Sequence, residues 1–223
     1  MKKAVELVDE PETVIAIDRG ERNLAVAVAI SKNNPDKPLK GQFWRGEEIK
    51  RIRGLYSHIR RRLQEKNRIG KIKELRGREE RKVTQQLHII ANEIIAYTKQ
   101  FPKPVIVMEN LNGIRNNFKN SKKINKRFHS LPFRRLQTII ECKALLEGIE
   151  VKYLTRKETE NTSKKCPKCG LTYYRDLNAA INIAHALTRG MGWGSCSSEP
   201  PEPAYVAGTQ RRKGRLNAGS SRL

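Results

Sequence analysis

The stretch Thr13-Val-Ile-Ala-Ile-Asp-Arg-Gly-Glu-Arg-Asn-Leu-Ala-Val-Ala-Val-Ala-Ile30 decides the fold of this chain. Its two apolar runs flank the polar residues 18–23, which have the composition of a turn, so the stretch predicts a β-hairpin. Neither run alternates with polar residues, which indicates strands that are covered on both faces, as in the middle of an α/β sheet. Residues 41–45 predict a third strand at the edge of the sheet.

The rest of the chain predicts helices alternating with strands. The expected elements are residues 47–100 (helical), 104–109 (strand), 131–146 (helix), 149–154 (strand) and 176–188 (helix). Gly70 and Gly77 are expected to interrupt the long helical segment, and Gly148 is expected to end the helix before it. The order βββ-α-β-α-β-α indicates an α/β fold, with a mixed sheet flanked by helices.

The charge of the chain indicates a polyanionic partner. Its 223 residues include 46 Lys+Arg against 23 Asp+Glu, a formal net charge of +23, which favours nucleic acid. A solvated basic surface, as on ribosome-associated proteins, is the alternative and also implies nucleic acid. No apolar run approaches the roughly 20 residues of a membrane span, and the first residues lack a signal-peptide pattern. We therefore expect a cytoplasmic protein without a membrane partner, associated with the nucleoid when bound to DNA.

Three carboxylates stand where buried elements are expected to reach the surface. Asp18 and Glu109 each end an apolar strand, and Asp176 opens the last helix. An acid in such a place is costly unless a cation binds it. Three of them on separate elements predict a site for two Mg²⁺ or Mn²⁺ ions, which suits phosphodiester hydrolysis. Each acid alone has an ordinary explanation, as a turn residue, a strand end facing water and a helix N-cap respectively, but the three together favour the metal site.

The segments around these acids resemble the three RuvC motifs of TnpB proteins, which are transposon-associated, RNA-guided DNA nucleases related to the compact type V CRISPR effectors. The matching stretches are Val14-Ile-Ala-Ile-Asp-Arg-Gly20, Ile106-Val-Met-Glu-Asn-Leu111, the zinc-knuckle pair Cys166-Pro-Lys-Cys-Gly170, and Arg175-Asp-Leu-Asn-Ala-Ala-Ile-Asn-Ile183. The resemblance implies an RNase H-like (RuvC) fold and places Asp18, Glu109 and Asp176 at the catalytic metal-ligand positions. It also implies DNA cleavage linked to transposition and DNA recombination.

Two departures from the family pattern determine the expected organisation. The first RuvC strand begins at residue 13, so we expect the amino-terminal regions that grip guide RNA and target DNA in family members to be absent. The family zinc ribbon has two CxxC knuckles, and this sequence has one. We expect residues 1–12 to be a lead-in, 13–189 a nuclease domain with a truncated zinc-knuckle loop at 155–175, and 190–223 a disordered tail.

The cysteines predict an incomplete zinc site. Cys166 and Cys169 could supply two of the four ligands that a structural zinc ion needs. Cys142, Cys196 in the tail or His185 in the last helix could complete the site, but the spacing requires none of them. Cys142 falls in a predicted helix, where burial as a small hydrophobic residue is the simpler role. Zinc is therefore less favoured by the sequence than magnesium or manganese.

Basic residues gather in two stretches that we expect to contact nucleic acid. Residues 50–82 are predicted to be helical, and residues 110–140 contain no acid and directly follow Glu109. The residues expected to contact phosphates are Arg60, Arg61, Arg62, Lys66, Arg68, Arg115, Lys119, Lys122, Lys123, Lys126, Arg127 and Arg175. Phe118 and Phe128 are candidates for base stacking or for anchoring the loop. A solvated charged face is the alternative for both stretches.

Two functions of different classes are compatible with these patterns. The first is a TnpB-like nuclease that binds DNA and hydrolyses it with Mg²⁺ or Mn²⁺, with guide RNA and a full-length TnpB or transposase in trans as candidate partners. The second is a catalytically inactive nucleic-acid-binding protein, either a transposon remnant or a regulator. A zinc-ribbon protein of the translation machinery is a third possibility, which the missing second knuckle disfavours. Metal-dependent cleavage separates the first function from the others.

Overall fold

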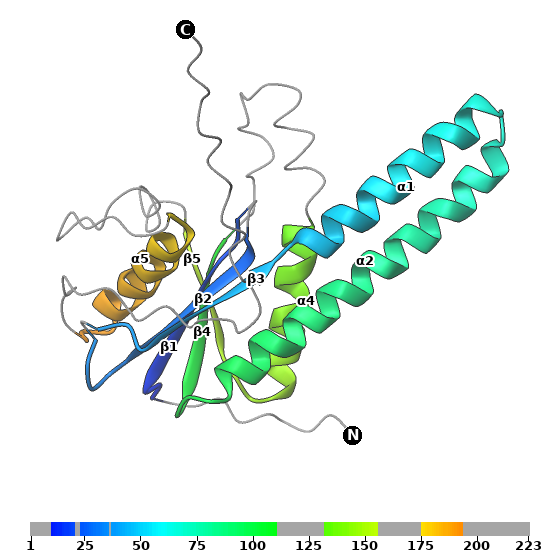
Figure 1. The fold of residues 1–223 in the computed structure, drawn as a ribbon. Helices are drawn as coiled ribbons and strands as arrows, with labels where there is room; N and C mark the ends of the chain where they lie inside the picture. Colours follow the sequence, from blue (N-terminus) through cyan, green and yellow to red (C-terminus); the bar gives the residue numbers. More distant parts are fainter. Residues whose placement is uncertain (1–9, 21–22, 36, 111–131, 156–174, 194–223) are drawn as a thin grey trace, which may run out of the picture.

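The core of the molecule is one mixed sheet, seen here in a computed structural model (Figure 1). The structure describes residues 10–20, 23–35, 37–110, 132–155 and 175–193. The strands are β1 (Thr13–Asp18), β2 (Asn23–Ser31), β3 (Lys40–Arg45), β4 (Pro104–Glu109) and β5 (Val151–Leu154), in the order β3-β2-β1-β4-β5. β1 pairs antiparallel with β2, as β2 does with β3, whereas β4 is parallel to both β1 and β5. The predicted hairpin and the edge position of β3 are confirmed, and the fold is RNase H-like.

Helices cover both faces of this sheet. Those in the described part of the chain are α1 (Glu47–Glu65), α2 (Ile69–Thr98), α4 (Phe133–Leu146) and α5 (Arg175–Gly190). α5 packs on one face, while α2, α4 and the first half of α1 pack on the other (Figure 1). α1 and α2 run side by side as a helical hairpin that extends well beyond the sheet. The predicted order of helices and strands is therefore confirmed.

Alternate residues of each central strand belong to opposite halves of the core. On β1, Ile15 and Ile17 pack with α2 and α4, whereas Val14 and Ala16 pack with α5. All four side chains are completely buried, which explains why this run lacks the polar alternation of a half-exposed strand. The same period of two places the next residue, Asp18, on the α5 side.

The long helical segment breaks at a place that the sequence did not indicate. α1 ends at Glu65, and α2 begins at Ile69 after a turn in which Asn67 has a φ of 50°. Asparagine tolerates this left-handed conformation better than most residues with a side chain. Gly70 and Gly77, the predicted breaks, lie inside α2. Gly70 is the second residue of α2, so the break falls three residues before it, at Asn67. The predicted break at Gly77 was wrong, because a glycine within a helix costs only about 1 kcal/mol.

The prediction for Cys142 was also wrong, because this residue lies on the exposed side of α4. The buried residues of α4 include Leu136, Ile140 and Ala144, which repeat every four positions and form one face. Cys142 follows Ile140 by two positions and therefore points away from that face. By contrast, Gly148 ends the α4 region as predicted, with a φ of 74° and its N–H donating to the carbonyl of Leu145 at 3.2 Å.

Several predicted features fall outside the described residues. They are Cys166, Cys169, Cys196, Phe118, Phe128 and most of the predicted loops at 110–130 and 155–175 and of the tail at 190–223. His185 lies within α5 and is 4% exposed. None of the described helices is long and apolar enough to cross a membrane.

Candidate active site

Two of the predicted acids end neighbouring strands on the same face of the sheet. β1 and β4 pair in parallel and in register along their length, so Asp18 and Glu109, at their carboxyl ends, are neighbours. The residues two positions earlier, Ala16 and Val107, are completely buried and pack with α5. Because side chains alternate along a strand, both carboxylates belong to that same α5 side.

α5 brings the third acid to this edge of the sheet. Asp176 lies in the first turn of α5, and its Oδ2 accepts a 2.9 Å hydrogen bond from Nδ2 of Asn23, the first residue of β2. A β-carbon at Gly20 would stand 3.3 Å from the same Oδ2. Asp176 is therefore held against the turn between β1 and β2, beside the end of β1 that carries Asp18. α5 already includes Arg175, so Asp176 lies inside the helix and is not its N-cap.

The environment of Asp18 disfavours its ionised form. Burial, together with the nearby charges of Glu109 and Asp176, raises the pKa of Asp18 from its usual value near 3.8 to about 7. The main-chain N–H and the guanidinium of Arg19 act in the opposite direction but do not cancel the rise. Asp18 keeps some surface open to solvent, yet protein atoms crowd its carboxylate closely enough that desolvation is the largest cause.

These carboxylates fit a hard divalent cation by their chemistry. They offer oxygen ligands, which Mg²⁺ and Mn²⁺ prefer, and their mutual repulsion is what a bound cation would relieve. Among the residues that the structure describes, no three His, Cys, Asp or Glu side chains are grouped closely enough to hold a metal ion as they stand. Both findings hold, because charges influence one another over about 4–6 Å, whereas a ligand oxygen must lie about 2.1 Å from Mg²⁺.

Arg19, like Asn23, is a residue at this site to which the sequence analysis gave no role. Its Nη2 donates a 2.6 Å hydrogen bond to the main-chain carbonyl of Glu109, and its Nη1 donates to Oε1 of Gln137 on α4. Burial lowers the pKa of Arg19 to about 10, against the opposing effect of Asp18 and Glu109, so the guanidinium stays charged at neutral pH. The one signal in the sequence was a cation directly after an acid at the end of an apolar strand.

One of the predicted phosphate-binding residues pairs inside the protein. Arg60 of α1 forms a part-buried ion pair with Glu79 of α2, and this pair joins the two helices of the hairpin. The exposed predicted residues on the hairpin are Arg61, Arg62, Lys66 and Arg68. The predicted residues outside the described part are Arg115, Lys119, Lys122, Lys123, Lys126 and Arg127, and Arg175 begins α5.

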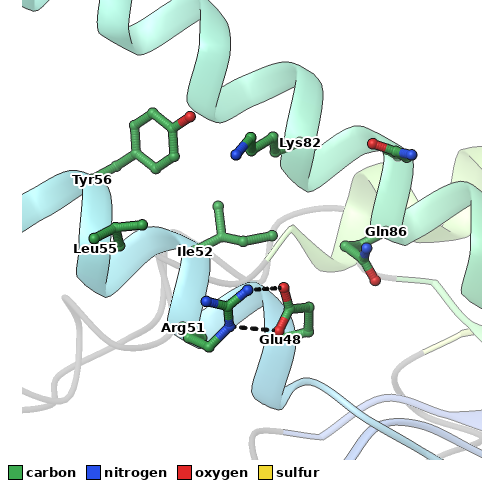
Figure 2. Close-up of a pocket in the computed structure, with 8 residues that line it drawn as sticks. Glu48, Arg51, Ile52, Leu55, Tyr56, Lys82 and Gln86 are labelled. Carbon is green, nitrogen blue, oxygen red and sulfur yellow. Dashed lines mark hydrogen bonds and ion pairs between the residues drawn. The ribbon is translucent and has the colours of Figure 1, made fainter.

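A hollow of about 270 Å³ lies between α1 and α2, and none of the three acids lines it (Figure 2). At one side, Arg51 donates to both carboxylate oxygens of Glu48, at 2.6 and 2.7 Å. On α2, Nζ of Lys82 lies 5.8 Å from the centre of the Tyr56 ring, within the range of a cation–π contact. Both cations of the hollow thus have partners within the protein, and nothing in its lining favours an anionic ligand.

Comparison with known proteins gives matches of three kinds. Residues 133–183 match the family model described as Cas12f1-like, TNB domain. The chain is 33% identical over 166 residues to the TnpB-like protein MJ0751 of Methanocaldococcus jannaschii, an alignment that covers 71% of this chain and 57% of that protein. This chain therefore spans little more than half the length of that relative.

Among solved structures, the Cas12f1-sgRNA-target DNA complex matches with a TM-score of 0.60 and 24% identity, over 79% of this chain and 50% of that chain. This likeness shows the fold. A RuvC structure from Thermus thermophilus matches with a TM-score of 0.41 and 11% identity, over 81% of this chain and 96% of that chain.

Proposed function

The chain belongs to the TnpB family over the part of a family member that it spans, and we propose that it is a metal-dependent, RuvC-type DNA nuclease linked to transposition and DNA recombination. One observation supports the proposal: Asp18, Glu109 and Asp176 lie on three separate elements at the same edge of the sheet, and the charges of the other two raise the pKa of Asp18. Carboxylates held close together raise each other's cost of ionisation, and the nearby guanidinium of Arg19 does not cancel this cost for Asp18. A perturbed acid of this kind supports a site that binds a cation.

In this proposal each residue has a stated task. Asp18, Glu109 and Asp176 would hold Mg²⁺ or Mn²⁺, which when bound stabilises negative charge on the attacking and leaving oxygens of a phosphodiester. Asn23 orients Asp176 by donating to its Oδ2. β1 and β4 fix the backbone positions from which Asp18 and Glu109 extend, because the residues before them are completely buried.

The proposed partners are nucleic acids. The solved Cas12f1 complex contains sgRNA and target DNA, and we extend both to this chain, with DNA as the substrate. A full-length TnpB or transposase is the protein that could act beside it in trans. Zinc binding by Cys166 and Cys169 stays a prediction.

The experiment that tests this function measures cleavage of labelled single-stranded and duplex DNA with Mg²⁺, with Mn²⁺ and with EDTA. We expect cleavage by the wild-type chain only with a divalent cation, and its loss in Glu109→Gln, which keeps the shape of the side chain but removes its charge. Equal cleavage by the two proteins would contradict the proposed chemistry. DNA binding without cleavage by either would favour the inactive nucleic-acid-binding alternative.

The exposed cations near the far end of the helical hairpin should contribute to DNA affinity and not to the chemical step. Changing Arg62, Lys66 and Arg68 together to alanine should weaken DNA binding by about tenfold to a hundredfold at moderate salt. The slope of log affinity against log salt concentration should fall by about 2 to 3, because each lost phosphate contact releases one counterion fewer. The cleavage rate at saturating DNA should stay unchanged. Fluorescence anisotropy over a salt series measures the first two quantities.

A matched control removes three cations elsewhere on the surface, two exposed and one, Lys152, partly buried. Lys99, Lys103 and Lys152 each pair with a glutamate at 2.6 to 3.5 Å, and their replacement by alanine gives the same change in net charge. We expect a much smaller loss of DNA affinity from this control. Equal losses in both triple variants would show that net charge alone acts and that the hairpin is not a binding surface.

Gly20 should matter for activity because of its closeness to Asp176. In Gly20→Ala the new methyl group would stand 3.3 Å from the main-chain oxygen of Asn23 and from Oδ2 of Asp176, so the carboxylate must shift by a few tenths of an ångström. We expect cleavage to slow by about tenfold, with a small change in Tm. In the control Gly54→Ala, the added atom meets nothing within 4 Å and cleavage should match the wild type. Wild-type activity in Gly20→Ala would contradict the placement of Asp176.

A further inference from the structure

Arg19 joins the ends of two strands at the point where their pairing stops. The parallel ladder of β1 and β4 ends with Ile17 opposite Met108. Beyond it, Nη2 of Arg19 reaches from the end of β1 to the main-chain carbonyl of Glu109 at 2.6 Å. The Arg19 side chain therefore extends the hydrogen bonding between β1 and β4 by one more residue, and that residue is Glu109, a proposed metal ligand.

The guanidinium is fixed from the opposite face of the sheet. Arg19 directly follows Asp18, and the alternation of the strand directs its side chain away from α5, toward α4. There Nη1 donates to Oε1 of Gln137, a residue only 9% exposed. The contact joins residues 118 positions apart in the sequence, so α4 sets where the cation lies.

We propose, on the premise that the three acids bind a divalent cation, that Arg19 is a positioning residue whose two effects oppose each other. By holding the carbonyl of Glu109, it fixes the separation of Glu109 from Asp18 and so supports the geometry needed for cleavage. Through its positive charge, it weakens the binding of the divalent cation to the same carboxylates. When the acids are ionised, the guanidinium offsets one of their negative charges and so lowers the attraction of the site for a cation.

A residue with only a structural role would act differently. Its loss would loosen the acids and weaken cation binding and cleavage together. Loss of Arg19 should instead slow cleavage while strengthening cation binding, because it removes a positive charge that interacts with Asp18 and Glu109 in a partly buried site. We expect the change in affinity to be about tenfold, and the opposite signs of the two changes are the diagnostic feature.

The test compares Arg19→Gln, Arg19→Lys and the control Arg51→Gln. Isothermal titration calorimetry without DNA gives the Kd for Mn²⁺, and gel assays at saturating Mn²⁺ give the cleavage rate. Arg19→Gln should bind Mn²⁺ about tenfold more tightly and cleave at least about tenfold more slowly. Arg19→Lys should keep the wild-type Kd but cleave slowly, because an ammonium group cannot span both partners of a guanidinium. Arg51→Gln, which alters a cation that is paired with Glu48 (Figure 2), should match the wild type in both.

Unchanged or weaker Mn²⁺ binding by a folded Arg19→Gln would overturn the inference. Asp18→Ala tests the premise separately: if it binds Mn²⁺ as tightly as the wild type, the proposed function itself fails. If Asp18→Ala loses Mn²⁺ binding while Arg19→Gln does not bind Mn²⁺ more tightly, only the role of Arg19 fails.

A second variant tests the inference if circular dichroism shows that Arg19→Gln is unfolded. Gln137→Ala removes the partner that fixes the guanidinium but keeps the charge of Arg19. Slower cleavage at an unchanged Kd would support the inference, and an unchanged rate would overturn it.

Discussion

Replacing Asp18 with asparagine should abolish metal-dependent cleavage and at the same time make the protein more stable at pH 8. Asparagine has the same shape but no charge, so it cannot replace a carboxylate as an anionic ligand. Burial and the charges of Glu109 and Asp176 raise the pKa of Asp18 to about 7, so the folded protein resists ionisation of this group. Each pKa unit corresponds to about 1.4 kcal/mol. After allowance for partial exposure of the side chain, we expect a gain of roughly 2 to 4 kcal/mol in the free energy of unfolding.

Urea denaturation in EDTA at pH 8 measures this gain, and the gel assay measures the loss of cleavage. Glu48→Gln is the control, because Glu48 is a carboxylate on the surface that pairs with Arg51 and whose pKa this pairing lowers. It should neither stabilise the protein nor alter cleavage. A loss of stability in Asp18→Asn would show that Asp18 makes a favourable interaction in the folded protein, and the case for a metal site would weaken. Such exchanges of stability for activity are common at functional sites.

The loss in the free energy of unfolding that Asp18 causes should depend on pH and on the concentration of magnesium. In the unfolded chain Asp18 loses its proton near pH 3.8, and in the folded protein near pH 7. Between these values the folded state binds more protons, so the free energy of unfolding falls as the pH rises. The advantage of Asp18→Asn over the wild type should therefore be near zero at pH 4, grow up to about pH 7 and stay constant above it.

Mg²⁺ should reverse this loss in the wild type alone. A ligand at a hundred times its Kd stabilises a folded protein by about 2.7 kcal/mol, so saturating Mg²⁺ at pH 8 should return much of the stability lost through ionisation. Asp18→Asn should gain far less. Denaturation curves across a pH series give the free energy of unfolding of the wild type and of Asp18→Asn, each with Mg²⁺ and with EDTA. An advantage of Asp18→Asn that does not change with pH would contradict the raised pKa of Asp18.

The parts of the fold that the sequence predicted are those in which a local pattern has one physical explanation. The apolar runs of β1 and β2 are unbroken because both faces of these strands are buried, and only the interior of a covered sheet requires that. The break between α1 and α2 was missed because it occurs at Asn67, whereas glycine was expected to mark it. The helix continues through Gly77, because one glycine within a helix costs only about 1 kcal/mol.

The sequence predicted which acids belong to the candidate site, but it did not predict which residues contact and orient them. Asp18 and Glu109 stood out because a charge at the end of an apolar strand requires an explanation. Asn23 and Arg19 did not, because their roles depend on contacts with residues 153, 118 and 90 positions away. Which side of the sheet α4 and α5 occupy is a property of the assembled chain, and no single stretch of sequence encodes it.

The helical hairpin has a consequence for how the molecule moves. No side chain from residue 57 to residue 78 is buried, whereas Ile49, Ile52 and Val83 are buried in the core at the end of the hairpin next to the sheet. Because the hairpin is packed at one end and exposed to solvent at the other, its helices can unfold locally from the exposed end while the sheet stays folded. Amide hydrogens there should exchange with deuterium long before those of the strands. The outer turns of α1 and α2 would then be flexible enough to adapt to the shape of a bound nucleic acid.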